Sequence, residues 1–283
     1  MSTHQIVTAD YRENQSGGIM ICGINFGFSK EDEQNETKRR ETVGEPRSFF
    51  SDLSVNQTGF RSRILDWLSS WGLAFATMAG KEGAFERSFF QTNWLDTQTR
   101  SVDSDEKISK KVLLNESAGI LSVIEERCPS VILFFGVDLI EVFNDISIRD
   151  RLESVLGGRS GNPENLTADL LGYIGQKFTM RVQQYGDTSI ISVPHPNSHG
   201  LTNEYIAALR PPKSVMDKIL AKMNRPNDDL IDAARKALSD GGEFTISFLQ
   251  RTFKLGHGHA IELYRALEES SQAPGISKGK NHP

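Results

Sequence analysis

The chain has 283 residues, ordinary apolar content and a formal net charge of −5, enough for a large domain with its own core and a second, smaller one. The negative charge means that nucleic-acid binding would require a local basic face rather than overall attraction. No apolar stretch approaches the roughly 18 residues of a membrane span, and the polar residues 1–18 lack the apolar segment of a signal peptide. The two cysteines, Cys22 and Cys128, favour a reducing compartment and are too few for a four-thiolate cluster. We therefore expect a cytoplasmic protein that does not bind membranes.

The first strong feature is an apolar run, residues 19–22, that leads directly into a Gly-x-Asn-x-Gly sequence. An uninterrupted apolar run is typical of a strand buried on both faces of a parallel sheet. The glycines allow the backbone to turn sharply and to approach a ligand closely. Because α/β folds place ligands at the carboxyl ends of parallel strands, the amide of Asn25 is predicted to face a cleft. The same sequence also fits a simple strand-to-turn junction.

Helical and strand patterns alternate along the next part of the chain. The polar residues 29–46 predict a solvated loop, and the aromatic segment 88–94 predicts a strand that ends at Asn93. A second uninterrupted apolar run, residues 131–136, predicts another buried strand, and residues 148–175 predict an insertion with some helix. Strands that alternate with helices predict a doubly wound α/β sheet. The other expected elements are helices at 60–71, 112–127, 139–143 and 203–209, and strands at 178–185 and 188–193 joined as a hairpin.

A second unit is expected after the prolines at 211–212. A helix over residues 214–223 leads to it. From Asp228 the pattern reads helix, short strand at 244–246, helix capped by Ser247, tight turn and helix. This order is typical of a winged helix-turn-helix. The predicted domains are 1–212, a linker helix at 213–227, the winged helix at 228–270 and a disordered tail at 271–283.

Taken in order, several segments resemble the uracil-DNA glycosylase superfamily over residues 17–210. The Gly-Ile-Asn-x-Gly sequence at 23–27 is similar to the first motif of its mismatch-specific and single-strand-selective branches. His195 followed by Pro196 is similar to the opening of its second motif. Separately, residues 228–269 resemble the gamma winged-helix domain of FtsK-type DNA translocases. The resemblances imply a three-layer α/β/α sheet of the uracil-DNA glycosylase type, followed by a small winged helix-turn-helix domain.

The resemblance also implies a monofunctional DNA glycosylase, which flips a base out of DNA and cleaves its glycosidic bond to leave an abasic site. Asn25 would hold the attacking water and stabilise the sugar, and His195 would donate a hydrogen bond to the departing base. Asn93 would read the base edge, and Phe49 or Phe50 would stack on its ring. The implied partner is DNA, no cofactor or metal is implied, and we expect a monomer. The other residues placed against the base are Gly23, Ile24, Phe26 and Gly27, and those placed against DNA are Ser198, His199, Leu201, Arg251, Lys254, His257 and His259.

Gly27 bears on the choice of base. Family members that are strict for uracil have a bulky tyrosine at this position, whereas glycine leaves room for a substituent on the pyrimidine ring. We therefore expect a 5-substituted pyrimidine, such as hydroxymethylcytosine or its glycosylated form. Its removal would serve base-excision repair or defence against phages.

The sequence leaves structural interpretations open for each of these residues. Asn93 could satisfy backbone groups at a strand end, His195 could be a turn residue, and Phe49 and Phe50 could be core residues. The winged helix could bind protein rather than DNA. The alternative to an enzyme is a catalytically weak or inactive protein that binds DNA or a modified base. A small-molecule hydrolase on a similar sheet is a third possibility.

Overall fold

A computed structural model of the chain describes residues 4–24, 26–28, 48–50, 59–76, 82–96, 98–100, 108–223, 228–255 and 257–271. Contacts divide the chain into two compact units. The first comprises Met1–Glu82 and Glu86–Ile219, and the second comprises Gly83–Phe85 and Leu220–Pro283. The division falls inside helix α10 (Lys213–Met223), which occupies most of the segment predicted to be a linker helix.

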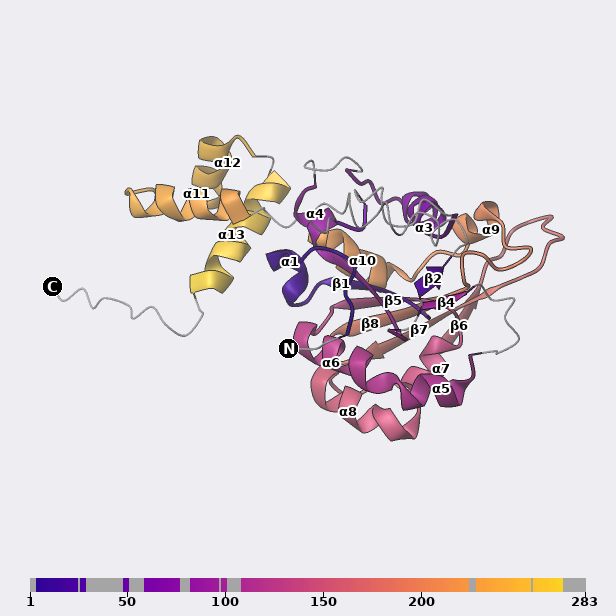
Figure 1. Cartoon of the computed structure of the whole chain (residues 1–283). Helices are drawn as coiled ribbons and strands as arrows, with labels where there is room; N and C mark the ends of the chain where they lie inside the picture. Colours follow the sequence, from indigo (N-terminus) through magenta and orange to yellow (C-terminus); the bar gives the residue numbers. More distant parts are fainter. Residues whose placement is uncertain are drawn as a thin grey trace, which may run out of the picture. The chain divides into compact units, whose positions relative to one another are not determined.

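The first unit has an α/β fold built on one mixed six-stranded sheet, which is flanked by helices (Figure 1). In the order in which they lie side by side, the strands are β3 (Phe89–Asn93), β1 (Ile19–Gly23), β5 (Val131–Phe135), β8 (Thr188–Val193), β7 (Thr179–Tyr185) and β6 (Glu164–Thr167). The first four run parallel to one another, and β7 and β6 are antiparallel to their neighbours. The predicted buried strands and the hairpin between β7 and β8 are therefore confirmed.

The strand order fixes where a ligand is expected. Every residue of β1, β5 and β8 is buried, and the uninterrupted apolar runs predicted this for β1 and β5. Along the chain, the four parallel strands come in the order β1, β3, β5, β8, but in the sheet β1 lies between β3 and β5. The direction of winding therefore reverses between β1 and β5. Open α/β sheets bind ligands outside the carboxyl ends of their strands at such a reversal.

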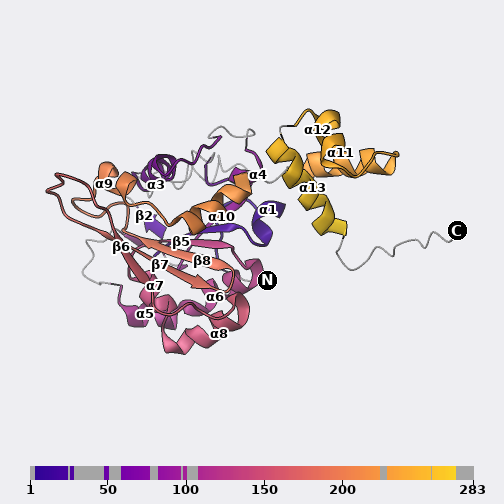
Figure 2. The same cartoon turned by 180° about the vertical axis from the view of Figure 1, so that it is seen from behind.

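Helices cover both faces of the sheet (Figures 1 and 2). The helices α3 (Gly59–Ser70) and α9 (Asn203–Ala208) lie on one face together with the start of α10. Trp67 and Trp71 of α3 are buried, as the helical spacing predicted. The opposite face is covered by α5 (Lys110–Asn115), α6 (Ser117–Arg127), α7 (Leu139–Phe143) and α8 (Ile146–Leu156), and two short helices are α1 (Arg12–Gln15) and α4 (Ala84–Arg87).

Three elements of this unit differ from the prediction. The helix expected at 112–127 is interrupted at Glu116, where the Ser117 hydroxyl donates to the carbonyl of Leu114 (2.7 Å) and competes with the regular helical bond. Within the segment 148–175, β6 adds an edge strand that lacks an apolar pattern because it is largely exposed. A small parallel pair, β2 (Phe26–Phe28) with β4 (Gln98–Arg100), was also not predicted. The loop predicted at 29–46 lies outside the described residues.

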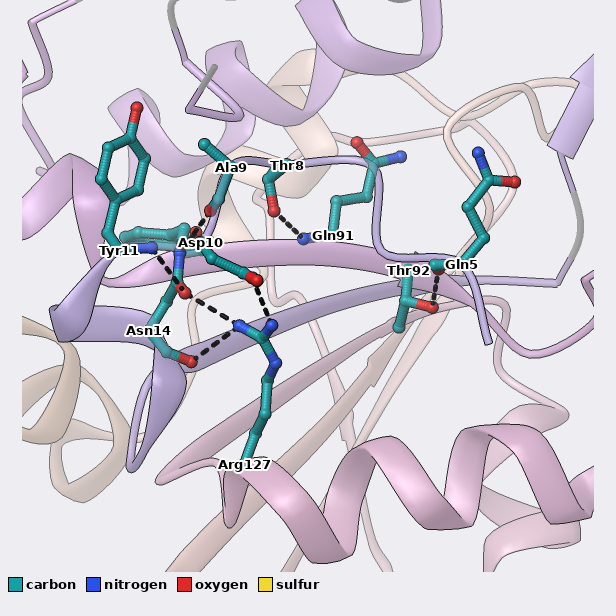
Figure 3. A network of polar contacts seen from close by, with 10 residues as sticks. Gln5, Thr8, Ala9, Asp10, Tyr11, Asn14, Gln91, Thr92 and Arg127 are labelled. Carbon is teal, nitrogen blue, oxygen red and sulfur yellow. Dashed lines mark hydrogen bonds and ion pairs between the residues drawn. The ribbon is translucent and has the colours of Figure 1, made fainter. Parts of the chain in front are cut away.

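The amino-terminal segment covers the outer edge of β3 (Figure 3). The amide of Val7 donates to the carbonyl of Gln91 (3.0 Å), so the edge strand gains a partner on its open side. Arg127, at the end of α6, donates to Oδ1 of Asn14 (2.8 Å) and forms an ion pair with Asp10. These contacts fix the position of the strand that ends at Asn93.

From Asp228 onward, the described residues of the second unit form the helices α11 (Asp228–Ser239), α12 (Ile246–Phe253) and α13 (His257–Ser271). The strand predicted at 244–246 is wrong, and the described residues of this unit contain no strand. Thr245 instead caps α12, because its hydroxyl accepts a hydrogen bond from the amide of Phe248 (3.1 Å), and Ser247 lies inside the helix. The tail beyond Ser271 lies outside the described residues. The buried core of the unit consists of Ile231, Ala234, Leu249, Ala260, Leu263 and Leu267.

No helix in the described part of the chain is long and apolar enough to cross a membrane.

Candidate functional site

The carboxyl ends of the parallel strands are joined by backbone hydrogen bonds that continue past the strands. On one side of the winding reversal, the amide of Trp94 donates to the carbonyl of Gly23 (2.8 Å). On the other side, the amide of Gly136 donates to the carbonyl of Val193 (2.9 Å). The segments that follow β1, β3, β5 and β8 therefore leave the sheet at a common edge.

Phe60 of α3 lies over this edge and touches the ends of three strands. Its ring centroid is 5.8 Å from that of Phe135, at the end of β5, and 5.4 Å from the ring of His195, which follows β8. A methyl group added at Gly23, the last residue of β1, would lie 3.8 Å from Cζ of Phe60. The residues predicted from the ends of β1 and β8 are therefore brought to one aromatic ring. That ring is half-buried.

Asn93 reaches the same place from the end of β3. Its side chain lies directly against the backbone of Gly23, because a methyl group at Gly23 would be 2.5 Å from Oδ1 of Asn93. The residue is only 3% exposed, yet its amide makes no hydrogen bond within the described part of the chain. The side chain therefore retains both a donor and an acceptor for a ligand.

The loop after β8 fixes the tautomer of His195. The backbone amide of Asn197 donates to Nδ1 of His195 (3.2 Å), so this nitrogen acts as the acceptor and Nε2 carries the proton of the neutral ring. Burial lowers the pKa of His195 below its ordinary value, which favours the neutral form. Among the described residues we find no hydrogen-bond partner for Nε2. At neutral pH the ring therefore presents a free N–H donor.

Gly136 determines the path of the backbone directly after β5, next to the point between β1 and β5 where the direction of winding reverses. Its φ of +143° is one that residues with a side chain rarely adopt, and a methyl group there would lie 3.3 Å from Cδ1 of Ile24. Ile24 is half-buried and directly follows β1. The loops after β1 and β5 therefore meet, as the strand order requires.

Arg63, one turn along α3 from Phe60, holds the loop that carries His195. Its guanidinium donates to the carbonyls of Pro196 and Leu201, the latter at 2.6 Å. Both ends of the loop are thus bonded to the helix whose Phe60 touches the histidine ring. Sequence patterns did not identify Phe60 or Arg63 as site residues, because helical periodicity assigned them to the core and to the solvent face of an amphipathic helix.

No protein-family model matches this chain, and no curated protein matches it. Function must therefore be inferred from the geometry of the strand ends. The six described residues gathered there are Gly23, Ile24, Phe60, Asn93, Gly136 and His195, and none of them is acidic. No group of three or more potential metal ligands occurs in the described part of the chain.

The two aromatic residues predicted to stack on a base are core residues in this structure. Phe49 is 2% exposed and Phe50 is fully buried. The ring of Phe50 is stacked on Phe75 at 4.4 Å and meets the edge of Phe89 at 4.8 Å. Stacking on a base would require Phe75 to be displaced, so the structural interpretation of both residues fits the observed contacts better. Phe60 is the aromatic residue that the structure places beside His195.

The remaining predicted base-binding residues are only partly described. Asn25 lies outside the described residues, although it directly follows Ile24 at the reversal point. Phe26 and Gly27 contribute backbone to β2, and their side-chain environment is not described. The roles predicted for these residues remain predictions.

The residues predicted to contact DNA fall into two groups. After His195, Ser198 is half-buried and His199 is exposed, whereas Leu201 is 6% exposed and would have to leave the core to reach a ligand. In the second unit, Arg251 is exposed on α12, and Lys254 is exposed at its end with a φ of 53°. The other two, His257 and His259, lie in the first turn of α13, and their side chains are outside the described set.

Proposed function

We propose that this protein is a DNA glycosylase that holds a flipped pyrimidine between Asn93 and His195 and hydrolyses its glycosidic bond. One observation carries the proposal. Two polar groups without a hydrogen-bond partner in the described part of the chain, the Asn93 amide and Nε2 of His195, lie at the carboxyl edge of the parallel strands, the first against Gly23 and the second beside the ring of Phe60.

The chemistry of the reaction fits these two groups. When the glycosidic bond breaks, positive charge develops on the sugar and negative charge on the departing base. Water then supplies a hydroxyl group to the sugar and a proton to the base. A neutral histidine with its proton on Nε2 can donate to the base oxygen where the negative charge appears, and the loss of one such donor typically costs about 2.7–4 kcal/mol of barrier.

The other side chains would recognise the base. The Asn93 amide can both donate and accept, as reading the edge of a pyrimidine requires. Phe60 would supply the stacking surface first predicted for Phe49 or Phe50, a contact worth about 1–3 kcal/mol per base. Asn25, next to Ile24, would orient the attacking water.

The fold and the second unit support the same proposal. A mixed sheet with helices on both faces is compatible with the three-layer arrangement of the uracil-DNA glycosylase superfamily, which the sequence resembles. The second unit would act as a DNA-binding module through Arg251 and Lys254. Two weak DNA contacts on one chain raise the effective concentration of the site at the DNA. The enzyme would act as a monomer without a cofactor.

The proposed substrate is a 5-substituted pyrimidine, because Gly27 lacks the side chain that excludes such bases from uracil-specific relatives. Removal of the base would serve either repair or defence against phages whose DNA carries modified pyrimidines.

The test uses oligonucleotides that carry uracil, hydroxymethylcytosine or glucosylated hydroxymethylcytosine, incubated with the protein and then treated with alkali. We expect alkali-dependent strand breaks with the wild type and a strong loss of breaks with Asn25→Ala and His195→Ala. Lys111→Ala is the control, because Lys111 is exposed on α5, across the sheet from α3. Strand breaks that persist without His195 would contradict the proposed mechanism.

The alternative is a protein that binds a modified base without cleaving it. One observation favours it: none of the six described site residues is a carboxylate that could activate the attacking water, and the basic nitrogen of His195, Nδ1, already accepts a hydrogen bond from the amide of Asn197. This alternative predicts tight, modification-dependent DNA binding and no strand breaks with any of the three oligonucleotides.

A further inference from the structure

The backbone carbonyl of Asn93 is bonded to a histidine from the start of the chain. Nε2 of His4 lies 2.7 Å from this oxygen, and because a carbonyl can only accept, Nε2 carries the proton. His4 is 89 residues away in the sequence and only 9% exposed. Since the amino-terminal segment covers the outer edge of β3, Asn93 is held between His4 on one side and Gly23 of β1 on the other.

A glycine in α6 makes room for the ring of His4. A methyl group at Gly119 would overlap Nδ1 of His4 and lie only 3.1 Å from Cγ, and the three atoms nearest to it all belong to this histidine. Gly119 lies inside a helix and has no positive φ, so the backbone there does not require glycine. Alanine would be the more stable residue in a helix. The missing side chain is therefore matched to the histidine ring.

The next residue of the segment also bonds to the end of β3. The amide of Gln5 donates to Oδ1 of Asp96 (3.2 Å), and its carbonyl accepts from the hydroxyl of Thr92 (2.8 Å; Figure 3). Gln5 makes both bonds with its backbone, whereas His4 bonds to Asn93 with its side chain. The contact with Asn93 can therefore be removed by substitution while the neighbouring bonds remain.

We propose that His4 is a positioning residue, which holds the Asn93 amide in place by fixing the backbone at the end of β3. This inference rests on the proposed function, in which Asn93 reads the base edge. The rotamers open to a side chain depend on its backbone dihedrals, so a change in the backbone of Asn93 would redirect its amide. A displacement of about 1 Å at a site can reduce the rate by about 10²-fold. A hydrogen bond made outside the site would thus control recognition of the base.

Hydrogen exchange tests the contact without DNA. The amide of Trp94 is bonded to the carbonyl of Gly23 (2.8 Å), so its exchange rate reports opening of the chain directly after Asn93. We expect His4→Ala and Gly119→Ala each to raise this rate by about tenfold or more. The amide of Gly136, which is bonded beyond β5, should keep its wild-type rate. A wild-type rate for Trp94 in either variant would overturn the inference.

Two further variants control for the substitution itself. Gln5→Ala should leave the exchange rate of Trp94 unchanged, because Gln5 is exposed and uses its backbone for both bonds. His4→Gln should restore slow exchange, since glutamine can place an amide N–H near the position of Nε2. Gly119→Ala decides the matter if His4→Ala fails to fold, because alanine favours the helix.

Base release separates this inference from the proposed function. We expect His4→Ala to release modified pyrimidines about tenfold more slowly than the wild type, and to cause no further loss when added to Asn93→Ala. An equal loss in both backgrounds would mean that His4 serves general stability, and would refute the positioning role. No release by the wild type would refute the proposed function, while the exchange rates would still decide whether His4 holds the end of β3.

Discussion

Gly23 is the residue whose lack of a side chain gives Asn93 its place at the site. In Gly23→Ala the new methyl group would lie 2.5 Å from Oδ1 of Asn93, and the amide, at the end of a side chain, would rotate away. We expect base release to fall by about tenfold or more while the melting temperature changes little, because the strand itself need not move. Gly158→Ala is the control, since a methyl group there meets nothing within 4 Å. A fully active Gly23→Ala would show that Asn93 does not read the base.

His195 links the site to the pH dependence of stability. Burial lowers its pKa in the folded state below the ordinary value of 6.5, so below that pH the unfolded chain binds more protons than the folded one. Its contribution to stability is therefore complete above pH 6.5 and is lost as the pH falls toward the lowered pKa.

His195→Gln removes this titration. Thermal melts from about pH 8 to about pH 5 should therefore show a smaller loss of melting temperature for the variant than for the wild type. Equal losses would mean that the histidine is not held in its neutral form by burial.

At the residue scale, sequence patterns identified the side chains that follow strands and missed those supplied by helices. Asn93 and His195 could be predicted because the first ends a predicted strand and the second comes soon after one, and such positions share one edge of a parallel sheet. Phe60 and Arg63 could not, because only the docking of α3 over that edge gives them a role. The unpartnered state of the Asn93 amide is likewise a property of packing.

At the scale of elements, α3 positions the loop that carries His195 through Arg63. Arg63→Met keeps an apolar stem near Trp67 but removes the donors to Pro196 and Leu201. We expect the free energy of unfolding to fall by about 1–3 kcal/mol and base release to fall with it, because the loop of His195 loses both anchors. Urea unfolding and a base-release assay measure the two effects.

The control for Arg63→Met is Arg181→Met, which breaks a partly exposed ion pair between Arg181 and Glu141. Such surface pairs contribute only about 0–1 kcal/mol. Equal effects of the two substitutions on stability and activity would show that Arg63 is one more surface cation rather than a positioning residue.

The elements that the sequence predicted best are those whose burial is uniform. β1 and β5 are buried on both faces, so their apolar runs were unambiguous. β6 is largely exposed and had no such pattern. The segment 244–246 has residues typical of strands, but Phe244 stacks on Tyr264 at 4.2 Å and Thr245 caps α12. Tertiary contacts outweighed local propensity there.

At the scale of the whole molecule, the net charge of −5 means that the proposed DNA binding would depend on local cations. We expect Arg251→Ala combined with Lys254→Asn to raise KM for DNA and to leave kcat unchanged. The salt dependence of binding should become shallower by about two units of log K per log salt, one for each lost phosphate contact. Asparagine is chosen at 254 because it tolerates the positive φ there.

The control removes the same charge elsewhere. Lys111→Ala combined with Lys213→Ala takes two exposed lysines from α5 and α10 and should leave the salt slope unchanged. A similar change in slope for both pairs would mean that general charge, rather than α12, governs DNA binding.

The most direct test of the whole account is the amount of free base that wild type, His195→Gln and His195→Asn release from DNA with modified pyrimidines, measured by mass spectrometry. Glutamine can place an amide N–H near the position of Nε2, whereas asparagine reaches only the position of Nδ1. We predict release by the wild type, a lower rate for glutamine, and a rate for asparagine at least about tenfold lower still. Release that is equal in all three proteins, or DNA binding by the wild type with no free base, would contradict the proposal that His195 stabilises a departing base.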